Sequence, residues 1–395
     1  MLRYLTAGES HGPQLTAIID GFPAGFKPDL DRINRQLALR QAGFGRGRRM
    51  KIEADRAEIV SGLRHGLTLG SPISVVIRNR DWQNWKHVMN PADRSASSAA
   101  GRNAPLTAPR PGHADLAGGV KFNHKDFRNV LERASARETA ARVAIGALTR
   151  QLLEHFGVRF ASHVIRIGSV SLTKKYDTAD LPAFAGRVEK SKVRCADAST
   201  SARMVQAIKT AGKASDSLGG VVEIIVRGLP VGLGGFSQWD DRLDGRLAAA
   251  MMSVPSVKGI EIGAGFKLAG LPGSKAHDEI HYRQGSDPAR KDFYRRTNRA
   301  GGIEAGMTNG EDVIVRAAVK PVPTLGRPLM TVDISARNPA RAAAERADLC
   351  VVPAVGVVGE AVAALTLAGA FLDKFGGDSM TEIERNYRAY LDAPY

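Results

Sequence analysis

Two histidines stand in glycine-rich segments, where a side chain can lie beside a bound ligand. His11 lies in Gly8-Glu-Ser-His-Gly12, and His113 lies in Arg110-Pro-Gly-His-Ala-Asp115. An imidazole titrates near neutral pH and can therefore give or take a proton in the cell. A structural role or a simple surface position is the alternative for any lone histidine. The setting nevertheless makes His11 and His113 the candidates for proton transfer.

A basic segment with alternating glycines runs from Arg40 to Lys51, with the sequence RQAGFGRGRRMK. The glycines allow sharp backbone bends, and the planar fork of arginine suits carboxylate and phosphate oxygens. The segment therefore predicts an anion site. It is not a dinucleotide fingerprint, because Arg48 stands where that motif needs its third glycine. A basic surface turn is the alternative reading.

Two further arginines flank an expected helix start. Ser135 is followed three residues later by Glu138, which is a capping-box pattern. The pattern places Arg133 and Arg137 near a helix N-terminus, where free N–H groups and the helix dipole favour an anion. An ordinary capped helix would explain Ser135 and Glu138, although not the arginines.

The pair His277 and His281 could share a metal if both lay on one helix. The zincin motif needs Glu directly after the first His, and Asp278 occupies that position. We therefore expect no metal site.

The elements that must position these residues follow from apolar periodicity. Short runs rich in Val, Ile or Thr predict strands at residues 15–21, 72–78, 158–170, 221–228 and 313–320. Helical spacing predicts helices at residues 30–41, 135–156, 201–213, 240–252 and 353–372. The mixture lacks the regular alternation of a doubly wound fold, so it predicts an α+β protein with one domain over residues 1–395.

Composition restricts the classes of function. The 395 residues carry a net charge of +16 and two cysteines, Cys195 and Cys350. The charge favours anionic ligands, and two cysteines cannot form a disulfide framework, so we expect a reducing cytoplasm. We expect no signal peptide, and a buried core helix rather than a membrane span at residues 351–372. Residues 91–110 and 282–300 are expected to be mobile loops, as lids or as plain surface.

Taken together, these segments resemble the chorismate synthase family. The resemblance rests on eight stretches in the same order: residues 8–12, 40–50, 79–85, 110–115, 133–144, 276–279, 298–310 and 351–360. It implies a lyase that eliminates phosphate from 5-enolpyruvylshikimate 3-phosphate, in a 1,4-anti sense, to give chorismate. It also implies a requirement for reduced FMN, although the reaction has no net redox change.

The resemblance assigns roles residue by residue. The catalytic residues would be His11, as the proton donor to the departing phosphate, His113, at the flavin ring, and Asp348, which would assist flavin deprotonation. The residues that would bind substrate or NADP are Arg40, Arg46, Arg49, Arg110 and Arg137. The residues that would bind FMN are Arg133, Ala134, Ser135, Pro255, Ser256, Ala305, Lys320, Pro321, Val322, Pro323, Thr324 and Arg346.

The family fold implied is a β-α-β sandwich, with antiparallel sheets and helices packed between and around them, assembled as a homotetramer. NADPH would act only indirectly, through an external flavin reductase. The chain departs from the family at Ala305, where Gly is usual, and at Pro255 and Ser256, where Gln and Ala are more common. A flavin reductase and a basic nucleic-acid-binding protein are the alternatives, and scarce aromatic residues disfavour the latter.

Overall fold

The structure is a computed structural model that describes residues 1–47, 54–92, 104–174, 176–343 and 348–394. Its helices are α1 (Leu30–Gln41), α2 (Lys86–Met89), α3 (Asp115–Phe122), α4 (Arg128–Ala134), α5 (Thr139–His155), α6 (Leu181–Glu189), α7 (Ala198–Lys213), α8 (Leu243–Met252), α9 (Gly273–Ala276), α10 (Val352–Phe375) and α11 (Met380–Asp392). Its strands are β1 (Arg3–Ala7), β2 (Gln14–Asp20), β3 (Ala57–Ile59), β4 (Leu63–Arg64), β5 (Leu67–Thr68), β6 (Ile73–Arg78), β7 (Arg159–Ile167), β8 (Val170–Ser171), β9 (Gly220–Arg227), β10 (Val257–Ile262), β11 (Ile280–Tyr282), β12 (Phe293–Arg295), β13 (Ile303–Glu304), β14 (Met307–Thr308), β15 (Val313–Val319), β16 (Met330–Asp333) and β17 (Asn338–Arg341).

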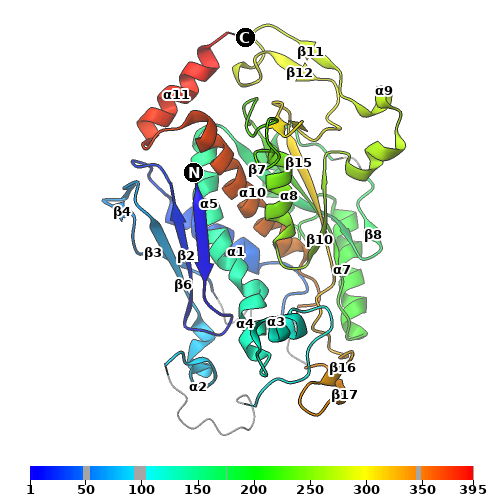
Figure 1. Ribbon diagram of the computed structural model, residues 1–395. Coiled ribbons are helices and arrows are strands. Elements are labelled where there is room, and N and C mark those ends of the chain that lie inside the picture. The colour runs from blue at the N-terminus through cyan, green and yellow to red at the C-terminus, as the bar shows by residue number, and fades with distance from the viewer. Residues whose placement is uncertain (48–53, 93–103, 175, 344–347, 395) are drawn as a thin grey trace.

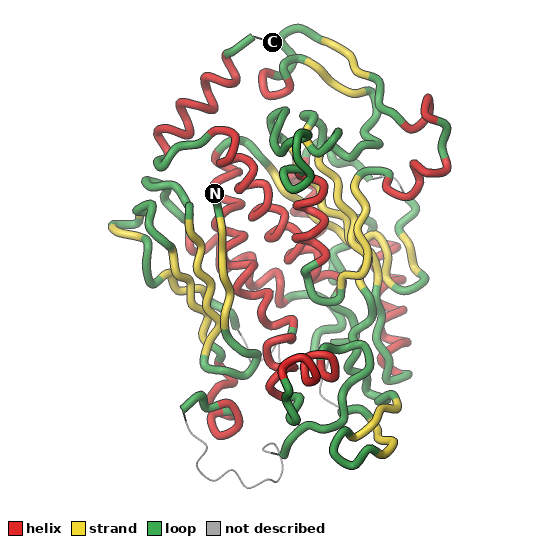
Figure 2. The backbone as a smooth tube through the Cα atoms, in the orientation of Figure 1, coloured by secondary structure: helices red, strands yellow, loops and turns green. Residues whose placement is uncertain are grey.

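Two antiparallel sheets form the framework. One has four strands in the order β1-β2-β6-β3, and the other has five strands in the order β10-β15-β9-β7-β8. Helices α1, α5 and α10 lie between the sheets in Figure 1. Helix α5 packs on β2 and β6, α10 packs on β7 and β9, and the two helices pack on each other. Figure 2 shows the same arrangement, with helices between two groups of strands. Antiparallel sheets combined with helices confirm the predicted α+β class.

The two central helices approach closely because α5 carries a glycine at their contact. A Cβ added to Gly146 would lie 2.5 Å from the Cβ of Ala361 and 2.7 Å from its backbone. Any side chain there would push α10 away, so the spacing of the central layer depends on this residue. Helix α10 is apolar enough to cross a membrane, but 89% of its most apolar window is buried. The predicted core helix is therefore confirmed.

All five predicted strands and all five predicted helices are present, with shifted ends. The segment 158–170 divides into β7 and β8, because Gly168 takes a left-handed φ of 54° and turns the chain. The predicted capping box is wrong. Ser135 Oγ accepts a hydrogen bond from the Arg137 N–H and caps a 3₁₀ turn, while Glu138 pairs with Arg142 of α5. The helix therefore begins at Thr139.

The two expected loops differ from each other. Of the first predicted loop, 91–110, the structure describes residues 91–92 and 104–110, and residues 93–103 lie outside the described part of the chain. The second, 282–300, is not a plain loop, because β12 lies within it and pairs with β11, which ends at Tyr282, to form a hairpin. Lys291, in the connection between β11 and β12, donates to the carbonyl of Ala393 at 2.8 Å. The hairpin lies beside the C-terminus, at the end of the molecule away from α2, α3 and α4 (Figure 1). Its mobility stays a prediction.

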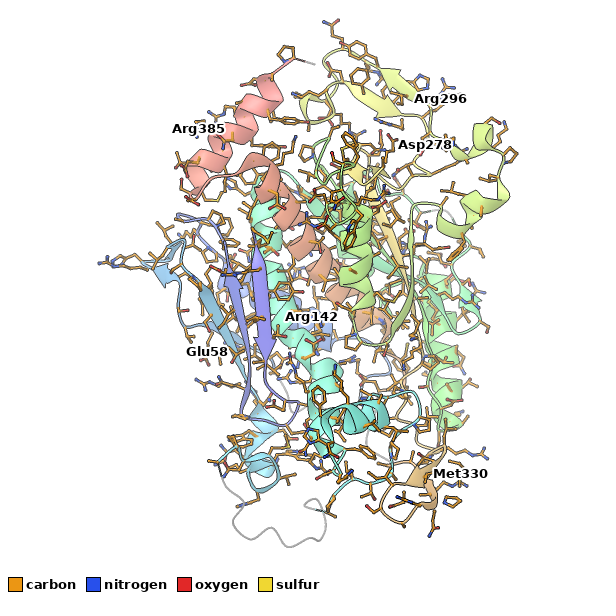
Figure 3. The ribbon with its side chains drawn as sticks, viewed as in Figure 1. Glu58, Arg142, Asp278, Arg296, Met330 and Arg385 are labelled. Atoms are coloured by element: carbon orange, nitrogen blue, oxygen red, sulfur yellow. The ribbon has the colours of Figure 1, made fainter. Side chains whose placement is uncertain are left out.

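The pair His277 and His281 does not share a helix. His277 ends α9, and His281 lies in β11. Asp278 between them accepts hydrogen bonds from the backbone N–H groups of Arg299 and Ala300, at 2.9 and 2.8 Å. Figure 3 labels Asp278 beside the β11–β12 hairpin. The acidic residue of this motif therefore fastens a backbone turn.

Candidate active site

His11 lies in the turn between β1 and β2, and its ring is held on two sides. Glu132 of α4 has a carboxylate oxygen 2.9 Å from His11 Nδ1. The indole of Trp85 stacks on the imidazole, with ring centroids 3.8 Å apart. The turn needs Gly8, because a Cβ at its φ of 104° would lie 2.3 Å from the carbonyl oxygen of Gln14. The His11 side chain keeps 14% of its surface exposed, so a ligand can reach it.

A buried polar network joins this turn to two arginines. Asn79, which follows β6, donates to the carbonyl of Gly12 at 2.7 Å and accepts from Arg137 Nη2 at 2.7 Å. Arg137 also donates to Asp55 at 2.5 Å, and Arg40 of α1 lies 3.4 Å from the same carboxylate. The three charged side chains are between 0 and 5% exposed. Two guanidinium groups around one carboxylate leave a net positive charge.

The charge balance of this network shows in Arg40. Burial lowers the pKa of Arg40, and the positive charges of Arg137 and Arg46 lower it further, whereas Asp55 and Asp348 oppose this shift. A buried cation with a lowered pKa is stabilised by an added negative charge. The cluster is therefore a site that favours an anion.

Arg46 and Asp348 form an ion pair beside this cluster. Arg46 Nη1 lies 3.1 Å from the Asp348 carboxylate, which also accepts the Gly47 N–H at 2.5 Å. Burial raises the pKa of the adjacent Cys350 to about 11, so that thiol stays neutral. The structure therefore brings together the predicted residues Arg40, Arg46, Arg137 and Asp348 from segments far apart in the sequence.

The second histidine has its own carboxylate partner. His113 Nδ1 lies 2.5 Å from Asp115, and Arg110 donates to both oxygens of that carboxylate, at 2.9 and 3.1 Å. Burial alone would raise the pKa of Asp115, but the hydrogen bonds from His113 and Arg110 outweigh it and hold the pKa well below its usual range. His113 precedes α3, which contacts α4, so both histidines lie at the same end of the molecule (Figure 1).

The segment predicted to bind FMN at residues 320–324 joins the His113 group. Arg110 Nη1 donates to the hydroxyl of Thr324 at 3.1 Å, and Lys320 donates to the carbonyl of Gly112. The Lys320 N–H donates in turn to the carbonyl of Ser256 at 2.8 Å. Lys320 through Thr324, including Pro321, Val322 and Pro323, therefore meets Pro255 and Ser256 beside His113.

The other predicted FMN residues divide between two places. At the end of α4, Ser135 donates to Ser10 at 3.2 Å, and Arg133 donates to the carbonyl of Gly8 at 3.0 Å, so they and Ala134 lie beside the His11 turn. Ala305 lies elsewhere, in the β13–β14 turn. Gly306 after it accepts the N–H of Leu243, at the start of α8, whereas Ser256 follows the end of α8. Helix α8 has ten residues, so its start, near Ala305, and its end, near Ser256, are about 15 Å apart. Arg49 and Arg346 lie outside the described residues.

Several residues that build the site had no predicted role: Asp55, Asn79, Trp85, Asp115 and Glu132. Asn79 and Trp85 lie in the motif 79–85, and Asp115 ends the motif 110–115, so these three belong to segments that carry the family resemblance. Glu132 is 121 residues from His11, and Asp55 is 82 residues from Arg137. No spacing rule connects partners so distant in the chain.

Comparison with known proteins agrees with this geometry. The sequence model of the family described as chorismate synthase matches residues 2–372. The chorismate synthase of Solibacter usitatus is 53% identical over 392 residues, covering 99% of each chain, and that of Desulforudis audaxviator is 54% identical, covering 99% of this chain and 98% of its own. The chain belongs to the chorismate synthase family.

A solved structure gives the same result at the level of the fold. A chain described as a crystal structure of chorismate synthase superposes with a TM-score of 0.78 at 38% identity, covering 99% of this chain and 97% of its own. The matches confirm the family resemblance that the eight segments indicated. Chorismate synthases are lyases, so the predicted enzyme class is confirmed as well. Neither a flavin reductase nor a nucleic-acid-binding protein is supported by these matches.

Proposed function

We propose that this chorismate synthase family member eliminates phosphate from 5-enolpyruvylshikimate 3-phosphate, in a 1,4-anti sense, to give chorismate. The observation that carries the proposal is the buried group of Arg40, Arg46 and Arg137, which two carboxylates, Asp55 and Asp348, do not fully neutralise. The substrate carries one phosphate and two carboxylates. A site that binds it must supply cations in excess, and bidentate guanidinium groups match all three anionic groups.

His11 is the residue that protonates the departing phosphate in this proposal. Its Nδ1 faces Glu132, so Nε2 is the ring nitrogen left for the substrate. The Asn79 amide ties the His11 turn to Arg137, and thereby places the proton donor beside the anion-binding cluster. Expelled phosphate develops negative charge, which both a proton and nearby cations stabilise. Arg110 and Arg49 would complete the set of substrate cations.

The residues around His113 fit reduced FMN. Lys320, Thr324 and Arg110 supply cationic and hydroxyl donors in one place, and Ser135 with Arg133 supplies another. When bound, reduced FMN lends an electron transiently to a reaction that has no net redox change. His113, held by Asp115, would set the protonation of the flavin ring, and Asp348 would assist its deprotonation. Ala305 and Arg346 remain predicted contacts.

The fold type, the assembly, the localisation and the supply of reduced flavin belong to the same proposal. The two sheets with helices between them support the β-α-β sandwich that the family resemblance implies. We propose a cytoplasmic homotetramer that receives reduced FMN from an external, NADPH-dependent reductase. Leu5 and Ile18, which face each other across β1 and β2 and are 76 and 43% exposed, supply an apolar surface for association.

The test is an anaerobic assay of chorismate formation with chemically reduced FMN. His11→Ala should lower turnover about 10²–10⁴-fold, the usual contribution of a general acid, while FMN binding persists. His113→Ala should lower turnover and also change the absorption spectrum of bound reduced flavin. His281→Ala is the control and should leave turnover unchanged. Chorismate formation that survives His11→Ala in full would refute the assigned role.

A further inference from the structure

We propose that Glu132 is the positioning residue for His11: it fixes the ring so that Nε2 faces the substrate. Trp85 holds the plane of the same ring by stacking. The inference rests on the proposed function, in which His11 protonates the departing phosphate. Glu132 itself would not touch the substrate, because its side chain is 1% exposed.

The contacts of Glu132 hold both the ring and the backbone of His11. Its two carboxylate oxygens lie 2.9 and 3.0 Å from His11 Nδ1, and Oε2 also accepts the His11 backbone N–H at 2.9 Å. The Glu132 carbonyl accepts the N–H of Ser10 at 2.9 Å. A carboxylate can only accept hydrogen bonds, so Nδ1 must carry hydrogen. Rotation of the imidazole about its χ2 bond would break this contact and the stack on Trp85.

The neighbouring charges leave the Glu132 carboxylate closest to His11. Among the described residues, Arg128 of α4 has no hydrogen-bond partner at Nη1; it lies 3.8 Å from Glu132 and 5.4 Å from the Trp85 ring. Asp81 accepts the indole N–H of Trp85 at 3.1 Å. The shortest contacts of the Glu132 carboxylate are therefore to His11, and the indole that stacks on the ring is itself held in place.

The second histidine provides a contrast within the same chain. Asp115, the partner of His113, gives both oxygens to Arg110 as well. The negative charge of Asp115 is thus shared with a guanidinium, and Arg110 Nη2 also lies 3.1 Å from His113 Nδ1. The Asp115 carboxylate therefore holds both His113 and Arg110 within hydrogen-bond distance, whereas Arg128 lies 3.8 Å from Glu132.

The test compares Glu132→Gln with a matched variant, Glu138→Gln. Glu138 is also a buried carboxylate of the same segment, but its partner is Arg142, labelled in Figure 3. In Glu132→Gln, turnover should fall by roughly 10²-fold or more, because wrong orientation of a catalytic histidine costs up to about 10⁴-fold. The dissociation constant for substrate should change by less than about threefold. Glu138→Gln should retain turnover.

A second measurement tests the contact between Glu132 and His11 without the enzymatic reaction. An imidazole stacked on an indole quenches its fluorescence, so the signal that Trp85→Phe removes reports whether His11 keeps its place on Trp85. This quenching, measured at one fixed pH in the free protein, should be weaker in Glu132→Gln than in the wild type. Glu132→Asp, which retains the carboxylate, should restore part of the quenching and part of the turnover, and it replaces Glu132→Gln if that variant does not fold.

The outcomes separate the two proposals. Weaker quenching in Glu132→Gln, together with a wild-type protein that forms no chorismate, would refute the proposed function and leave the pairing of Glu132 with His11 intact. An active wild type with full turnover in Glu132→Gln, or with unchanged quenching in that variant, would refute the positioning role. Equal loss of turnover in Glu138→Gln would assign the effect to the stability of α4 and α5 and would also refute it.

Discussion

Asp55 should be essential to the stability of the ligand-free protein, because it is the carboxylate between two buried arginines. It accepts from Arg137 at 2.5 and 2.6 Å and lies 3.4 Å from Arg40, and the three side chains are at most 5% exposed. Asp55→Asn keeps the shape and removes the charge. Breaking a buried ion pair from one side costs about 3–5 kcal/mol, so the free energy of unfolding should fall by about that amount.

The assay is urea unfolding at one fixed protein concentration, with Asp373→Asn as the control. Asp373 pairs with Arg246 at 3.3 Å, but these side chains are 45 and 31% exposed, so its loss should cost less than about 1 kcal/mol. Inorganic phosphate should stabilise Asp55→Asn more than the wild type, by up to about 2.7 kcal/mol at 100 times its dissociation constant. Equal losses in the two variants, or no added effect of phosphate, would refute the reasoning.

Three further predictions concern single residues. Arg46→Ala should weaken substrate binding by about 1.5–3 kcal/mol, or about 10- to 150-fold, the scale of a charged hydrogen bond; unchanged affinity by calorimetry in the folded variant would remove Arg46 from the site. Burial alone would raise the pKa of Glu223, but hydrogen bonds from His163 and Tyr176 hold it at about 2. The stabilisation that the Glu223 carboxylate provides should therefore be complete above about pH 4.5 and disappear as the pH falls to about 2. If the free energy of unfolding of Glu223→Gln falls with pH as steeply as that of the wild type over this range, this account is wrong. Ala305 has a left-handed φ of 49°, so Ala305→Gly should raise the free energy of unfolding by about 0.5–1 kcal/mol in urea, and a loss would show that the turn is not strained.

Local sequence was sufficient to predict the framework. Helix α5 is long and periodic, helix α10 is long and mostly apolar, and strands β2, β6, β9 and β15 are short runs rich in β-branched residues. These signals depend on neighbours a few residues away, so they can be read from one chain. Strands β1 and β10, which lie at sheet edges, were missed, because their burial is one-sided or slight and their residues resemble loop segments.

The start of α5 shows how tertiary contacts override a local pattern. Ser135 and Glu138 have the spacing of a capping box, but Arg142 takes the Glu138 carboxylate and Ser10 contacts the Ser135 hydroxyl. Among the described residues, a capping box forms instead at Ser379 and Glu382, at the start of α11. A capping pattern predicts hydrogen-bonding capacity, and the surrounding side chains decide which partner receives it.

The sequence by itself determined which chemical groups the site contains: two histidines in glycine-rich turns and a set of arginines suited to an anion. Only the tertiary structure decided how they are paired. Asp55 with Arg137, Glu132 with His11 and Asp348 with Arg46 are contacts between segments on different elements. Charge acts through distance in space. Packing of α1 and α5 against the first sheet, and the hydrogen bonds from α4 to the β1–β2 turn, help to set those distances. The charge balance of the site is therefore a consequence of the fold.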